Sequence, residues 1–101
     1  MTGRDRPPPA TPLEEAIAAY IKRAGIKRRL DQASVIPEWG ELVGPQIAAV
    51  TTPHLVTQDG ALIVSVASAG WLQELQLMSP TILKRLGQHG KKIRRIVWRA
   101  E

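Results

Sequence analysis

The sequence predicts one small α+β domain in which helices cover a three-stranded sheet. Three observations support this fold class. Apolar residues recur at helical spacing in three segments, two short apolar runs flank an Asp-Gly turn signal, and a basic segment near the C-terminus alternates like a strand. The predicted order is helix, helix, strand, strand, helix, strand. With 101 residues, 44% of them hydrophobic and 23% charged, the chain is long enough for one modest core.

The N-terminal residues divide into a tail and the start of the domain. Residues 1–10 are predicted to be a disordered proline-rich tail, because three consecutive prolines favour an extended segment that cannot join a core. Residues 11–101 are predicted to form the single domain. Thr11, Pro12 and Glu14 mark the first helix as its N-cap, its first-turn proline and its capping-box glutamate.

Two helical segments are predicted before the sheet. The first helix is expected to stop at Gly25, since glycine often ends helices. A second segment is expected from Ile26 to Val43, with a kink or a break near Ser34 to Pro37 because proline removes a helix hydrogen bond. Gln46 to Val50 is expected to add one helical turn. The apolar residues expected to pack on the helices' inner sides are Leu13, Ile17, Tyr20, Ile21, Ile26, Leu30, Ala33, Ile36, Leu42 and Val43.

A hairpin is predicted in the middle of the chain. Its strands run from Thr51 to Thr57 and from Ala61 to Ala67, and Gln58 to Gly60 form the turn. The alternating residues expected to face inward from the second strand are Leu62, Val64 and Val66.

The C-terminal third predicts a helix and a last strand. Ser68 is the expected N-cap of the helix, and Ser79-Pro80 predicts that this helix is either kinked or restarted. Lys92 to Arg99 is the expected strand, with Ile96 and Trp98 on one face. A right-handed crossover through the helix would place this strand parallel to one strand of the hairpin.

A pattern of motifs between two tryptophans carries family-level information. One tryptophan lies four residues before a Val-Gly pair, followed by Ile-Ala, Thr-x-Pro, an alternating strand that ends in serine, and a second tryptophan; a closing apolar strand follows. These residues are Trp39, Val43, Gly44, Ile47, Ala48, Thr51, Thr52, Pro53, Leu62, Val64, Val66, Ser68, Trp71, Ile93, Ile96, Trp98 and Arg99. The pattern resembles the DciA family of bacterial replicative-helicase loaders over roughly residues 13–99. The resemblance implies a K-homology-like (KH-like) domain, and the predicted element order is close to one.

Basic residues gather in two blocks. Five lie between Lys22 and Arg29 and seven between Lys84 and Arg99, and neither block contains an acidic residue. Such segregation indicates a polyanionic partner, with nucleic acid as the first candidate. The alternative is a pair of solvated faces that keep the protein soluble. The candidate nucleic-acid-binding residues are Lys22, Arg23, Lys27, Arg28, Arg29, Lys84, Arg85, Lys91, Lys92, Arg94, Arg95 and Arg99.

One glycine pair resembles a nucleic-acid-binding loop. In KH domains a G-x-x-G loop clamps the nucleic-acid backbone, and Gly87 and Gly90 have that spacing. There the loop joins two helices, whereas here it precedes the last strand. A helix stop at Gly87 followed by a turn into the strand is therefore the favoured interpretation, although Lys91 and Lys92 could still touch phosphate from that turn.

The tryptophans and histidines suggest packing and binding rather than catalysis. Trp39 is expected in the core, while Trp71 has two open interpretations, core residue or anchor for a partner protein. His54 is expected on the surface of a strand and His89 in a loop, outside any metal or acid-base spacing. We therefore expect no enzyme activity, no metal and no cofactor.

Composition also bears on location. The sequence has no cysteine, which excludes disulfides and thiolate metal sites. Its apolar runs are too short for a membrane span. We expect a cytoplasmic protein, with association with the nucleoid as a further option.

The resemblance implies a DNA-replication accessory protein. Such a protein binds a DnaB-type replicative helicase and promotes its loading on single-stranded DNA, and the basic blocks would bind nucleic acid without sequence specificity. RNA and double-stranded DNA remain further candidate ligands. Two alternative functions stay open: a general KH-like RNA- or DNA-binding module without a helicase partner, and a protein-interaction adaptor whose basic faces meet an acidic partner.

Overall fold

The computed structural model describes residues 11–101, and the predicted tail lies outside the described residues. The elements of this part of the chain are α2 (Pro12–Ala33), α3 (Val35–Val43), α4 (Pro45–Ala48), β1 (Thr51–Val56), β2 (Ala61–Val66), α5 (Ala69–Gln88) and β3 (Arg95–Ala100). The predicted α+β class and element order are confirmed and are consistent with a KH-like fold. The predicted break near Ser34 is also correct, since α2 ends and α3 begins around this residue.

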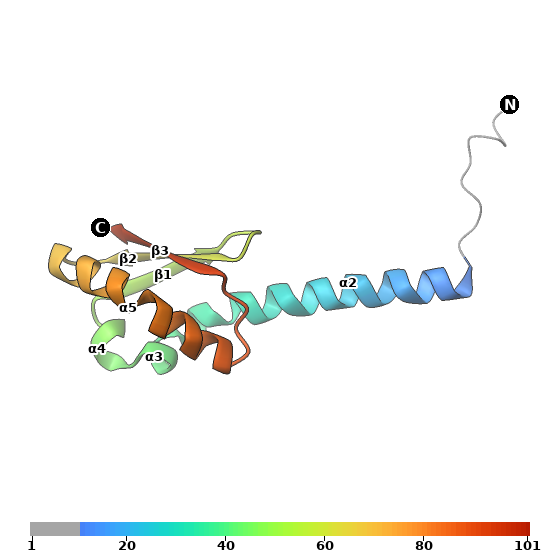
Figure 1. Ribbon diagram of the computed structural model, residues 1–101, viewed down its shortest axis with the longest axis horizontal. Helices are drawn as coiled ribbons and strands as arrows, with labels where there is room; N and C mark the ends of the chain where they lie inside the picture. The colour runs from blue at the N-terminus through green and yellow to red at the C-terminus, as the bar shows by residue number, and fades with distance from the viewer. Residues whose placement is uncertain (1–10) are drawn as a thin grey trace, which may run out of the picture.

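The sheet has the strand order β1-β2-β3. β1 and β2 pair antiparallel through the predicted hairpin, whose turn ends at Gly60 with a φ of 88° that favours glycine. β3 pairs parallel with β2, as the predicted crossover through α5 requires. Helices α3, α4 and α5 lie on one side of the sheet (Figure 1), and in residues 11–101 no helix covers the other face.

Two tryptophans hold the core together. Trp39 of α3 and Trp98 of β3 pack with their ring centroids 6.3 Å apart and their planes tilted by 54°. The indole N–H of Trp39 donates to Thr51 Oγ1 at 2.8 Å, and that of Trp98 donates to Ser79 Oγ at 2.6 Å. The fully buried side chains around the pair include the predicted inward residues of β2 and two leucines of α5; they are Val35, Leu62, Val64, Val66, Leu75 and Leu86.

Helix α2 departs from the prediction. It continues through Gly25 to Ala33, so the predicted stop at Gly25 is wrong. A glycine ends a helix when it adopts a left-handed conformation, and Gly25 has a negative φ and is followed by good helix formers. The core assignments on this helix are also wrong, because α2 projects away from the body and, within residues 11–101, most of its length packs against no other element (Figure 1). Its exposed predicted core residues are Leu13, Ile17, Tyr20, Ile21, Ile26, Leu30 and Ala33.

Helix α5 and strand β3 refine the remaining predictions. Ser68 caps α5 as expected by accepting from the Trp71 N–H. The helix runs through Pro80 without restarting. β3 begins at Arg95 rather than at Lys92. Residues 91–94 instead form a loop, in which the Arg94 N–H donates to the Gly60 carbonyl at 2.8 Å.

Two leucines of α5 test the packing. Leu75→Ala should destabilise the protein by about 2–5 kcal/mol, because Leu75 is fully buried and its truncation leaves a cavity. Leu77→Ala should stay within about 0.5 kcal/mol of the native protein, since Leu77 is 78% exposed. Urea unfolding of both variants measures the difference, and equal losses would contradict the placement of α5.

Candidate nucleic-acid interface

The two basic blocks meet where the end of α2 contacts the loop between α5 and β3. Gln32, a buried residue near the C-terminal end of α2, donates from Nε2 to the backbone carbonyl of Lys92 at 2.8 Å. This bond holds the second basic block against the first, although Gln32 and Lys92 are 60 residues apart in the chain. No pattern in the sequence indicates this role of Gln32, because a single polar residue on a helix is ordinarily solvated.

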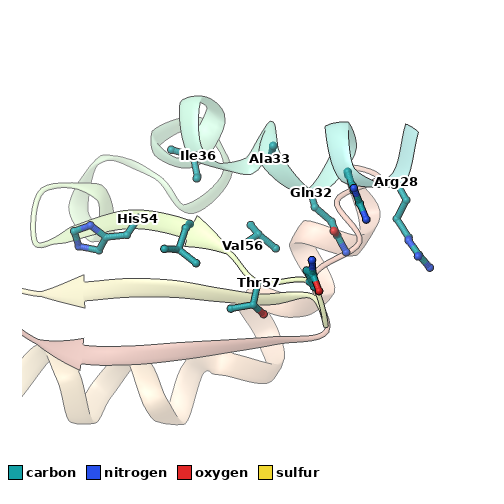
Figure 2. A pocket seen from close by; sticks show the side chains of 10 residues that line it. Arg28, Gln32, Ala33, Ile36, His54, Val56 and Thr57 are labelled. Atoms are coloured by element: carbon teal, nitrogen blue, oxygen red, sulfur yellow. The ribbon is translucent and has the colours of Figure 1, made fainter. Parts of the chain in front are cut away.

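Two hollows flank this junction. The larger, of about 450 Å³, lies between the end of α2, the start of α3 and the edge strand β1, and Figure 2 shows Arg28 at its rim. Its lining residues are Arg28, Arg29, Gln32, Ala33, Ile36, His54, Leu55, Val56, Thr57 and Gln58. The second hollow, of about 410 Å³, is lined by Tyr20, Ile21, Ala24, Gly25, Arg28 and Lys92. Arg28 therefore lines both hollows, and it shares the second with a cation of the other block.

The hairpin turn lies against the same loop. A Cβ atom at Gly60 would lie 2.9 Å from Cγ of Arg94, so only glycine lets the turn and the arginine lie this close. Arg95 pairs with Asp59 of the turn, with 2.9 Å between Nη1 and Oδ2. A hydrogen bond from Thr57, together with the charge of Arg95, holds the pKa of Asp59 below its ordinary value. The charge of Arg95 is thus partly balanced, whereas Arg94 is exposed beside it.

Lys91 is placed differently from its neighbours. Its side chain is only 10% exposed, and its Nζ lies 2.6 Å from both Glu38 Oε2 and Ser34 Oγ. The hydrogen bond from Lys91 is the main reason that the pKa of Glu38 lies below its ordinary value. The structure gives Lys91 a role in joining the loop to α3, and its predicted contact with phosphate stays a prediction.

The other predicted cations lie outside these two hollows. Lys27 pairs with Asp31 one turn along α2, with 3.1 Å between Nζ and Oδ2. Arg85 of α5 donates to the Leu42 carbonyl at 3.4 Å, which ties α5 to α3. The remaining members are exposed on α2, α5 and β3; they are Lys22, Arg23, Lys84 and Arg99.

The glycines and His89 after Leu86 end α5 and form the turn that follows it, and His54 lies on the surface. Helix α5 ends at Gln88, His89 is its C-cap, and Gly90 has a φ of 75°. The Lys91 N–H then donates to the Leu86 carbonyl at 2.9 Å, which closes the helix end. The Gly87 to Gly90 segment is therefore a helix end and a turn, but the predicted stop at Gly87 is wrong, because α5 continues to Gln88 and the glycine with a positive φ is Gly90. His54 is an exposed strand residue, with Nε2 2.9 Å from Ser65 Oγ.

Trp71 lies at the other end of α5, and its predicted role as an anchor for a partner protein stays a prediction. It is half-buried and packs partly against the core, but it also lines a shallow hollow of about 340 Å³ with Ser68, Gly70 and Glu74. Figure 1 shows that α5 begins at the end of the body remote from α2. Trp71 and the basic junction therefore lie at different ends of the body from which α2 projects.

Comparison with known proteins identifies the family. Residues 12–97 match the family described as "Dna[CI] antecedent, DciA". The chain belongs to the DciA family. The predicted resemblance is thereby confirmed. A "UPF0232 protein" of Rhodococcus jostii is 34% identical over 80 residues, and one of Mycobacterium tuberculosis is 31% identical over 75 residues. These matches cover 79% and 74% of this chain and 40% of each relative, so this DciA-family chain spans about 40% of the length of its curated relatives.

Two further properties of residues 11–101 concern membranes and metals. None of the described helices is both long and apolar enough to cross a bilayer. The same residues contain no group of three histidine, aspartate or glutamate side chains that could bind a metal ion.

The pair between Lys91 and Glu38 should make stability depend on pH. Because the pKa of Glu38 is lowered in the folded state from its ordinary 4.5, its contribution is complete above that value. The contribution is lost as the pH falls through the folded-state pKa. Urea unfolding of the native protein and of Lys91→Met, between about pH 7 and about pH 3, should show a stability gap that narrows in acid.

Lys92→Met provides the matched control. Lys92 is exposed and contributes its backbone carbonyl, not its ammonium, to the contact with Gln32. Its stability should run parallel to that of the native protein across the same pH range. A Lys91→Met gap that stays constant with pH would contradict the role of the ion pair.

Proposed function

We propose that this DciA-family chain binds a DnaB-type replicative helicase and promotes its loading on single-stranded DNA. The observation that carries the proposal is family membership over residues 12–97, since the family description names it an antecedent of DnaC and DnaI. The separation of the basic junction from Trp71 supports it, because a loader must hold DNA and helicase at the same time. Two contact surfaces at different ends of one small body meet that need.

The basic junction is the proposed DNA-binding surface. Arg28, Arg29 and Lys92 line the two hollows, and Arg94 is exposed on the same loop as Lys92. Cations spaced around a groove attract a phosphate backbone without reading bases. Binding there should consequently be strongly salt-dependent and weakly dependent on sequence.

Trp71 is the proposed anchor for the helicase. Tryptophan is enriched among residues that dominate protein interfaces, where a large apolar surface enters a pocket of the partner. The hollow beside Trp71 is open, and among the described residues Glu74 is the one charged residue that lines it. A partner side chain can fill this hollow without displacing any element of the fold.

The DNA surface can be tested with two double variants of equal charge change. Each phosphate contact to single-stranded DNA contributes about 0.7 to the slope of log affinity against log salt concentration. Replacing Arg28 and Lys92 by Gln should therefore reduce the magnitude of this slope by about 1.4. Replacing Lys84 and Arg99 by Gln should change the slope less, since neither residue lines the two hollows. Fluorescence anisotropy across a salt series measures both slopes. Equal losses would indicate diffuse attraction by net charge.

The helicase contact can be tested by capture of a purified DnaB-type helicase. Trp71→Ala and Glu74→Lys should each weaken capture by about tenfold or more while DNA affinity is retained. Glu74 is exposed, so its variant keeps the test meaningful if Trp71→Ala is destabilised. Leu77→Ala on the same helix is the control. Failure of the native chain to capture the helicase, with DNA binding intact, would overturn the proposal.

A further inference from the structure

Helix α2 carries an exposed apolar row. Leu13, Ile17, Tyr20 and Ala24 follow one another at spacings of four, three and four residues, so they lie along one side of the helix. Leu13 is 70% exposed, Ile17 50% and Tyr20 67%. The described part of α2 has a single buried residue, Gln32 near its C-terminal end, so the row lies beyond the reach of the core.

This exposure is energetically unfavourable in two respects. First, large apolar side chains remain in contact with water, and a row of such side chains is typical of an interaction surface. A helix without tertiary packing is also only marginally stable, even with a good N-terminal cap such as the capping box of Thr11 and Glu14. A partner that covered the row would stabilise both the surface and the helix.

We propose that the row is covered by helix α2 of a second copy of this chain, packed antiparallel. The distribution of charge along the helix is the reason. Glu14 and Glu15 lie in its first turn, whereas five cations lie from Lys22 to Arg29 without an acidic residue among them. A parallel pair would place like charges side by side, but an antiparallel pair places the acidic end of each helix beside the basic part of the other. The opposed helix dipoles also favour this orientation.

The sizes of the row's side chains suit one antiparallel register. When Ile17 of one copy lies opposite Tyr20 of the other, Leu13 lies opposite Ala24. The symmetric pair then has four apolar layers. Each of the two outer layers pairs a large residue, Leu13, with a small one, Ala24. In the same register Glu14 is level with Arg23 of the other copy. A two-fold axis relates the two helices, so the contact is closed and limits the assembly to a dimer.

The hollow beside Ala24 supports this register. Because Ala24 is small, it leaves a space of about 410 Å³ bordered by Tyr20, Ile21, Arg28 and Lys92. Leu13 of the second copy enters that space, and the following glutamate meets the two cations at its edge. Helical side chains lean toward the N-terminus, which brings the Arg28 head to the level of Ala24. The dimer does not require the proposed helicase or DNA contacts, but it uses Arg28 and Lys92 of the proposed DNA-binding surface, so DNA and the second copy compete for this hollow.

Cysteine cross-linking tests the orientation, because the chain has no cysteine of its own. Leu13→Cys carrying a size tag is mixed with untagged Ala24→Cys under mild oxidation. The antiparallel pair predicts that the mixed disulfide forms faster than either disulfide between identical variants. Faster joining of Leu13→Cys to itself would indicate a parallel pair and overturn the proposal. Ile26→Cys, on the opposite side of α2, gives the background rate.

Sedimentation equilibrium tests the dimer itself with two matched variants. Ile17 and Ile26 are each 50% exposed, and nine residues of α-helix place them on opposite sides of α2. Ile17→Glu should raise the dimer dissociation constant by about tenfold or more, and Ile26→Glu by less than about twofold. Circular dichroism confirms that both variants fold. Equal effects, or a native protein that is monomeric at about 1 mM, would overturn the proposal.

Discussion

The fold depends on burying two tryptophans in one small core. Trp39 and Trp98 come from a helix and a strand that are far apart in the sequence, and their rings pack against each other. Each indole also donates its N–H to a hydroxyl on a further element, Thr51 of β1 and Ser79 of α5. The pair therefore joins α3, β1, α5 and β3 at one place. Since phenylalanine is absent and aromatic residues make up only 4% of the sequence, these rings supply area that other cores draw from several aromatics.

The same packing explains how α5 accommodates a proline. Ser79 Oγ donates to the Leu75 carbonyl at 3.2 Å and accepts from Trp98, so the residue before Pro80 is held on both sides. Proline removes one backbone donor from a helix interior. Here the tertiary contact with β3 keeps the turn in place, and α5 remains long enough to place Trp71 and the C-terminal loop at opposite ends of the body.

A few polar contacts position the candidate interface. The bond from Gln32 to the Lys92 carbonyl and the ion pair of Lys91 with Glu38 attach one loop to two helices. These contacts bring cations that are far apart in the sequence together around two hollows. The charge of Lys91 is used for this attachment, while the side chain of Lys92 stays exposed. Adjacent lysines thus differ in role because one points toward α3 and the other toward solvent.

Local rules made the sequence informative wherever a few neighbouring residues decide the structure. The cap at Thr11, the turn at Gly60, the alternation of Leu62, Val64 and Val66, and the cap at Ser68 were all predictable, because their hydrogen bonds and side-chain directions lie within a few residues. The family motifs could be recognised in the sequence for the same reason.

The tertiary structure alone decided which of these elements have neighbours. The apolar residues of α2 looked like a core stripe, yet they are exposed because the body ends before the helix does. The sequence also showed two basic blocks without showing that Arg28 and Lys92 border one hollow. Such contacts join residues more than sixty positions apart, and they depend on how the whole core packs rather than on any local preference.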